Sequence, residues 1–212
     1  MLEICYILAG KLISMVSTQP YRLSFTAATL RIEDSGAHAQ FMLAHPEPYS
    51  WHSVPDDLFG NMKQSTFRRL LRELNHRLTT LPRAGLVLLS EGTYSQRRNM
   101  CYLAVLKTYP FIRHFVERVI IWNHEVFKTQ IEDWQYADFF RQEEMNYDEL
   151  REVSDATLAK MKRNLFTILR EAEIVSGKSE LMITPVIPGA EDSMVLSREP
   201  TNWNPYFTLR NQ

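Results

Sequence analysis

Residues 65–78, STFRRLLRELNHRL, are the segment that most constrains how this chain can fold. Apolar residues recur there about every three or four positions, which is the period of an α-helix. One side of such a helix would carry Phe67, Leu70, Leu71, Leu74 and Leu78. The opposite side carries Arg68, Arg69, Arg72 and His76, with Arg77 on the flank. The pattern predicts a helix that buries its leucines and presents arginines to an anionic partner.

Long periodic segments elsewhere favour a mainly α-helical fold, a compact multi-helix domain. Residues 94–109 are apolar on every side near their centre, which predicts a helix inside the core. Pro110 suits the first turn of a following helix. We expect that helix to reach about Phe127. Its side chains that face the core would be Phe111, Phe115, Val119, Trp122 and Val126.

A second basic helix is predicted over residues 155–172, capped by Ser154 or Asp155. Its inner side would hold Leu158, Met161, Leu165, Ile168, Leu169 and Ala172. Residues 86–90 fit either a strand or a buried helix, and residues 179–188 fit one or two short strands. The fold prediction therefore includes a short C-terminal β element.

Three regions are expected along the chain. Residues 1–18 are predicted to be an apolar extension and residues 19–188 the helical domain, with halves of about 19–92 and 93–188. Residues 189–212 are predicted to be an arm or tail. The extension is interrupted by Glu3 and Lys11 and is too short to span a membrane, so we expect no membrane contact. Met15, just before a change in composition, is an alternative start in one hypothesis.

Charge is segregated although the formal net charge is only −1. Residues 61–83 carry six Lys and Arg against one acid, whereas residues 131–155 carry nine acids against two Arg. Any nucleic-acid contact must therefore come from a local patch. The candidate phosphate contacts are Lys63, Arg68, Arg69, Arg72, Arg77, Arg97, Arg98, Lys160 and Arg163.

Each basic segment also has a structural interpretation. The arginine helix could be a solvated surface helix supported by Arg69 and Glu73. Arg97 and Arg98 could hold phosphate at a helix start or simply solvate it. The second basic helix carries Glu171 and Glu173 as well, so it could be structural, or it could be the recognition helix of a winged-helix unit with the following strand as its wing.

The residues offer little for catalysis or cofactor binding. Cys5 and Cys101 form no spaced pair, which fits a reducing, cytoplasmic setting. His38, His45 and His52 lie in a Pro-rich stretch without fixed geometry, so no metal site is expected. The acidic segment lacks a convincing nuclease spacing, and no phosphate loop or nucleophile motif is present, so we expect no cofactor and no enzymatic activity.

The order of several segments resembles the BrxA family of BREX bacteriophage-defence systems, over roughly residues 20–190. The resemblance rests on YRLSFTAATL (21–30), a loop with Trp51 and Asn61, residues 65–78, KTYPFIRHF (107–115) and DATLAKMKRNLFTILREAEI (155–174).

This resemblance implies a mostly helical fold similar to the antitermination factor NusB and no catalytic activity. It also implies binding to double-stranded DNA and work alongside other BREX proteins, including a methyltransferase. An alternative prediction is a protein-interaction adaptor whose acidic segment and C-terminal arm dock onto a BREX partner. The sequence leaves open DNA sequence preference and homo-oligomer formation.

Overall fold

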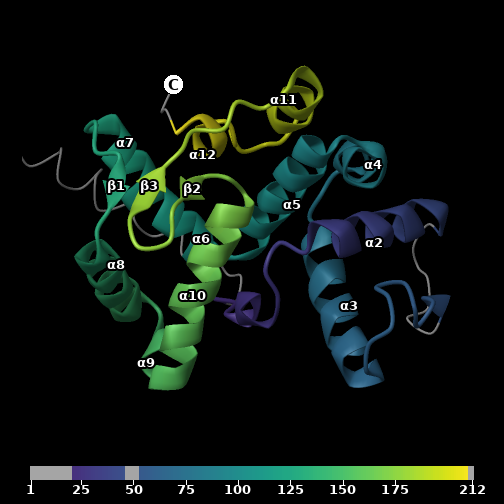
Figure 1. Cartoon of the computed structure of the whole chain (residues 1–212), viewed down its shortest axis with the longest axis horizontal. Helices are drawn as coiled ribbons and strands as arrows, with labels where there is room; N and C mark the ends of the chain where they lie inside the picture. Colours follow the sequence, from purple (N-terminus) through teal and green to yellow (C-terminus); the bar gives the residue numbers. More distant parts are fainter. Residues whose placement is uncertain (1–20, 46–52, 210–212) are drawn as a thin grey trace, which may run out of the picture.

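The computed structural model describes residues 21–45 and 53–209, which form a mainly helical domain with a small antiparallel sheet (Figure 1). The predicted extension (1–18), including Met15, and Trp51 of the loop that supports the family resemblance lie outside the described residues. Two short elements that are not α-helices are the 3-10 helix η1 (Ser24–Ala27) and the π-helical segment η3 (Val116–Ile121). The α-helices are α2 (Ile32–Ala44), α3 (Gln64–Leu78), α4 (Arg83–Glu91), α5 (Tyr94–Thr108), α6 (Pro110–Phe115), α7 (Trp122–Glu125), α8 (Asp133–Asn146), α9 (Asp148–Arg151), α10 (Asp155–Glu171), α11 (Ala190–Ser197) and α12 (Pro205–Thr208).

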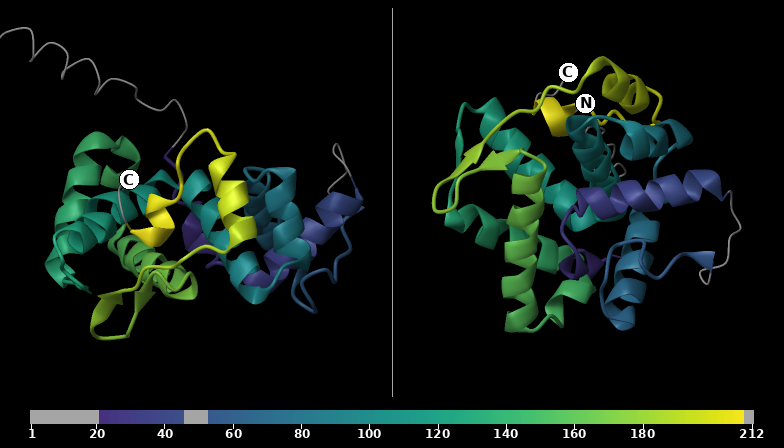
Figure 2. Two further views of the ribbon diagram at one scale, coloured as in Figure 1. Left: turned by 90° about the horizontal axis from the view of Figure 1, so that it is seen from above. Right: turned by 45° about the vertical axis from the view of Figure 1, so that its right-hand side comes forward.

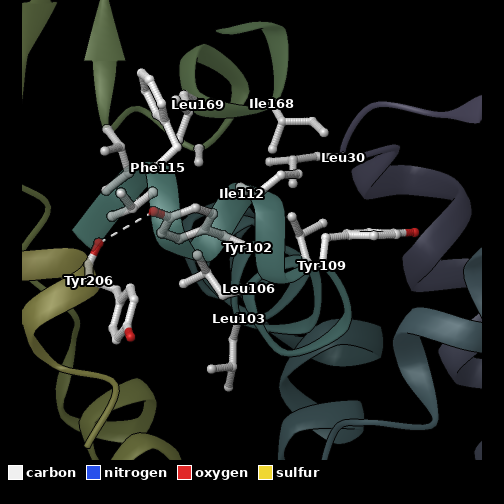
Figure 3. Close-up of a cluster of buried hydrophobic side chains, with 14 of the residues drawn as sticks. Leu30, Tyr102, Leu103, Leu106, Tyr109, Ile112, Phe115, Ile168, Leu169 and Tyr206 are labelled. Carbon is white, nitrogen blue, oxygen red and sulfur yellow. Dashed lines mark hydrogen bonds between the residues drawn. The ribbon is translucent and has the colours of Figure 1, made fainter. Parts of the chain in front are cut away.

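Helix α5 runs through the centre of the core, as its all-round apolar sequence predicts. Every residue from Arg98 to Leu106 is buried. Figure 3 shows Tyr102, Leu103 and Leu106 of this helix among side chains from α6, α10 and α12, and the Tyr102 hydroxyl donates a hydrogen bond to the Tyr206 carbonyl at 3.4 Å. A helix surrounded in this way can expose no polar side, which explains its composition.

The first half of the chain packs α2, α3 and α4 around the start of α5. Residues 86–90, which fit a strand or a buried helix by sequence, lie in α4. Helix α3 confirms the predicted apolar side: Phe67, Leu70, Leu71 and Leu74 pack in a small cluster with Phe41, Val54 and Phe59, and Leu78 joins the main core. The segment η1 lies between α3 and α10 and contacts both (Figures 1 and 2).

One packing prediction for the second half is wrong. Phe111, Phe115 and Val119 are buried as expected, but Trp122 is 46% and Val126 is 44% exposed. The cause is η3, whose wider π-helical turn shifts the register of the residues that follow it. The fully buried position there is instead Asn123, whose side-chain amide donates to Gln135 Oε1 at 3.0 Å.

The sheet has the strand order β1-β3-β2 and is antiparallel throughout. Strand β1 (Gln130–Ile131) precedes α8, whereas β2 (Val175–Ser176) and β3 (Leu181–Ile183) follow α10. This confirms the expected short C-terminal β element. Gly177 starts the turn between β2 and β3 at φ +86°, and a Cβ there would collide with the Glu180 carbonyl.

The C-terminal residues pack on the same core. Trp203, Tyr206, Phe207 and Leu209 are buried, and the Val186 amide donates to the Phe207 carbonyl at 2.9 Å. Figure 2 shows α11 and α12 lying against the upper part of the helical body. In residues 21–45 and 53–209, no helix is both long and apolar enough to cross a bilayer.

Candidate nucleic-acid interface

Helix α3 presents the row of arginines that the sequence predicts. Arg68, Arg69 and Arg72 are exposed, and Lys63 is exposed at the N-cap position just before the helix. In the described part of the chain, the ion pair on α3 joins Glu73 to Arg77, and the three exposed arginines have none. Their guanidinium groups are therefore available to an external anion.

A hollow of about 390 Å³ lies beside this row. Arg68 and Arg72 line one wall together with Gln64, and Asp56 lines the same hollow without reaching ion-pair distance. The Arg68 and Arg72 side chains are one helical turn apart on the same side of α3. Two guanidinium groups at this spacing can contact neighbouring phosphates of one backbone strand.

Arg77 does not belong to this surface, which corrects its place among the predicted phosphate contacts. Its side chain is only 2% exposed. Its guanidinium donates to the Tyr109 hydroxyl at 2.9 Å, to the Thr29 carbonyl at 2.5 Å and to the Ala28 carbonyl at 2.8 Å. Burial lowers the pKa of Arg77, and the adjacent Glu73 carboxylate, 3.2 Å from the guanidinium, acts in the opposite direction. Arg77 therefore connects α3 to the backbone that follows η1 and to Tyr109, the residue after α5.

Arg97 and Arg98 are also engaged within the protein. Arg97 pairs with Glu33 of α2 at 3.2 Å. Arg98 is buried and pairs with Glu173, just beyond α10. The N-terminus of α5 is closed by a capping box of Thr93 and Gln96. Both arginines therefore link parts of the fold, because acids of the protein itself hold their guanidinium groups.

Helix α10 carries basic residues whose neighbouring acids, Glu171 and Glu173, are engaged elsewhere, and its Lys162 pairs with Asp133 of α8. Glu171 accepts the Leu30 amide hydrogen bond at 2.7 Å, and Glu173 holds Arg98. The structure shows no ion pair for Lys160 or Arg163 among the residues it describes. Ser154 caps the helix, as predicted, by accepting a hydrogen bond from the Thr157 amide at 3.4 Å.

The elements around α10 occur in the order of a winged helix. A helix (α6 to α7) leads to β1, then α8 and α10 follow, and β2 and β3 close the unit. By element order alone, α10 stands where a winged helix has its recognition helix, and the β2–β3 turn stands where it has its wing. Lys178, which was not among the predicted phosphate contacts, is exposed on that turn. The sequence feature that could have indicated it is a lysine next to the turn-forming Gly177.

The acidic segment is less available than its composition indicates. Glu143 is fully buried and accepts hydrogen bonds from His114 Nδ1 at 2.8 Å, from Arg118 at 2.5 Å and from the Tyr21 hydroxyl. Burial alone would raise the pKa of Glu143, but these partners hold it below its ordinary value. Further acids pair on the surface, among them Asp133 with Lys162 at 2.9 Å. No group of three potential metal ligands occurs in residues 21–45 and 53–209.

The structure defines a mainly helical domain with a small three-stranded antiparallel sheet. The family model of BrxA matches residues 19–199, and the chain belongs to the BrxA family.

Two further proteins are similar to this chain. The protein described as "BREX protein BrxA" from Escherichia coli O9:H4 (strain HS) is 24% identical over 171 residues, covering 80% of each chain. An uncharacterised protein from Magnetospirillum magneticum has a crystal structure that matches with a TM-score of 0.75 at 14% identity, covering 91% of this chain and 99% of the other. The second likeness shows the fold alone.

Proposed function

We propose that this protein is a non-catalytic, double-stranded-DNA-binding component of a BREX phage-defence system. The observation that carries the proposal is the row of exposed arginines on α3, Arg68, Arg69 and Arg72, which form no ion pair within residues 21–45 and 53–209. Arginine suits phosphate because its planar fork can donate two parallel hydrogen bonds. Membership in the BrxA family supports the BREX setting.

The contacts we propose are mainly to the DNA backbone. Lys63 extends the α3 row, and Lys160 and Arg163 add a second contact on α10. Such contacts position a duplex without reading much sequence. The cytoplasmic location, the likeness to NusB and the work alongside other BREX proteins, including a methyltransferase, are part of the same proposal.

The test is the salt dependence of DNA binding. We expect Arg68→Glu with Arg72→Glu to weaken binding to all duplexes about equally. Losing two phosphate contacts should reduce the slope of log K against log salt by about 1.8. The helix content should stay unchanged, because both side chains are exposed.

The matched control is Lys128→Glu with Arg141→Glu, which makes the same change in net charge at the exposed α7–α8 edge. Equal losses in both variants would show that only net charge matters, and unchanged binding in the α3 variant would contradict the surface assignment. The same samples, incubated with magnesium, should leave the DNA uncut.

A protein-interaction adaptor is the second candidate function, and one observation favours it. Phe127 is 93% exposed at a positive φ of 60°, and the exposed Trp122 and Trp134 line one hollow of about 290 Å³. Exposed aromatic residues of this kind often anchor protein interfaces. An adaptor without DNA contact would show no salt-sensitive shift with random duplex.

A further inference from the structure

An apolar groove between α4 and α11 has no part in the proposed DNA contacts. It encloses about 480 Å³ and is lined by Ala84, Val87 and Leu88 of α4, by Glu191, Met194 and Val195 of α11, and by Arg83 and Arg198 at the helix ends. Met194 is 54% and Val87 is 36% exposed. Exposed aliphatic side chains gathered in a groove commonly mark a binding surface.

Both walls of the groove are held in place by buried contacts. Asp192 of α11 is 1% exposed and accepts a hydrogen bond from Asn99 Nδ2 of α5 at 2.9 Å. Leu196, next to the groove residue Val195, is fully buried. On the other wall, Leu89 of α4 is fully buried, and α4 packs along α2. The groove is therefore preformed, which lowers the entropic cost of binding.

The charges around the groove define the chemistry of its occupant. Arg83 and Arg198 are exposed, and the structure shows no ion pair for either among the described residues. The acid in the lining, Glu191, accepts a hydrogen bond from the Gln96 side chain. An apolar floor with free guanidinium groups at its edges complements a segment that is apolar on one side and acidic at its margins.

The shape of the groove favours a helix as the occupant. Both walls are helices, and α4 with its nine residues is about 13 Å long, which matches two to three turns of a partner helix. Five of the eight lining residues are apolar, and the three charged ones, Arg83, Glu191 and Arg198, stand at helix ends. We propose that the α4–α11 groove docks an acidic amphipathic helix of a partner protein.

Docking there is compatible with DNA binding elsewhere. Figure 1 and the right panel of Figure 2 show α4 and α11 toward the upper side of the molecule, and the N-terminal end of α3 at the lower side. A partner helix in the groove would leave Arg68 and Arg72 uncovered. The proposal does not depend on DNA binding.

The test uses a displayed library of helical peptides of about 15 residues, with leucines fixed at i, i+3, i+4 and i+7 and all polar positions randomised. We expect selection on the full chain to enrich acidic peptides. Met194→Glu should weaken their binding at least about tenfold, because it places a carboxylate on the apolar floor. The matched control is Met145→Glu, the same change at an exposed methionine of α8, and it should leave binding unchanged.

A charge swap checks the role of the arginines. Arg83→Glu with Arg198→Glu should shift the selection from acidic to basic peptides. The proposal is overturned if no peptides are enriched, if the parent selects neutral or basic ones, or if Met194→Glu and Met145→Glu behave alike. It is also overturned if duplex DNA displaces the peptides, because the groove would then be a nucleic-acid site. A retained DNA mobility shift in Met194→Glu would separate this result from the proposed function.

Discussion

Replacing Arg77 with methionine removes a buried cation but keeps most of its aliphatic packing. The side chain makes hydrogen bonds to Tyr109, Thr29, Ala28 and Glu73, and Glu73 is itself only 6% exposed. The variant would leave the Glu73 carboxylate buried without its cation and two backbone carbonyls without their donor. Four hydrogen bonds from a charged donor would sum to about 6–12 kcal/mol. The net loss of stability is smaller than this sum, because folding of the variant does not require the desolvation of a guanidinium group.

Breaking a buried ion pair by removing one partner costs about 3–5 kcal/mol, and we expect Arg77→Met to lower the free energy of unfolding by this amount. For a chain of this length the melting temperature should fall by about 10 °C. Removing the carboxylate as well, in Glu73→Leu with Arg77→Met, should cost less than the single change, because no buried charge then stays unpaired.

The assay is urea unfolding followed by far-ultraviolet circular dichroism, combined with a DNA mobility shift at low temperature where the variant stays folded. The folded variant should bind duplex with the parent's affinity and salt slope. A stability loss below about 1 kcal/mol, or weakened DNA binding by fully folded protein, would refute the structural role assigned to Arg77.

The remaining predictions concern a buried histidine and helix α10. Burial lowers the pKa of His38 to about 4, against a partial opposing effect of its hydrogen bond with Asn75, so the unfolded chain binds a proton near pH 6.5 that the folded chain does not. The free energy of unfolding should therefore fall by about 2 kcal/mol between pH 7 and pH 5. His38→Gln, measured by urea unfolding at pH 7 and pH 5, should lack this loss. An equal loss in the parent and in the variant would contradict the prediction. Arg163→Ala should weaken duplex binding and reduce the salt slope by about 0.9, and an unchanged titration would make α10 purely structural. Ser154→Ala should cost about 1 kcal/mol of stability by removing the N-cap of α10, with no change in a thermal melt as the opposing result.

The periodic parts of the fold could be predicted because helical burial repeats within a few residues. This holds for α3, for the centre of α5 and for α10, where Met161, Leu165 and Ile168 are all fully buried. Trp122 and Val126 could not be placed, because the π-helical segment changes the number of residues per turn and nothing in the local pattern signals that change.

The candidate site divides in the same way. Helical spacing alone predicts that α3 carries arginines opposite its leucines. Which cations are free depends on long-range contacts: Arg77, Arg97 and Arg98 meet acids or carbonyls from distant segments, Glu171 accepts the Leu30 amide, and Glu173 pairs with Arg98. Whether a charge is available depends on partners far away in the chain, and periodicity carries no information about them.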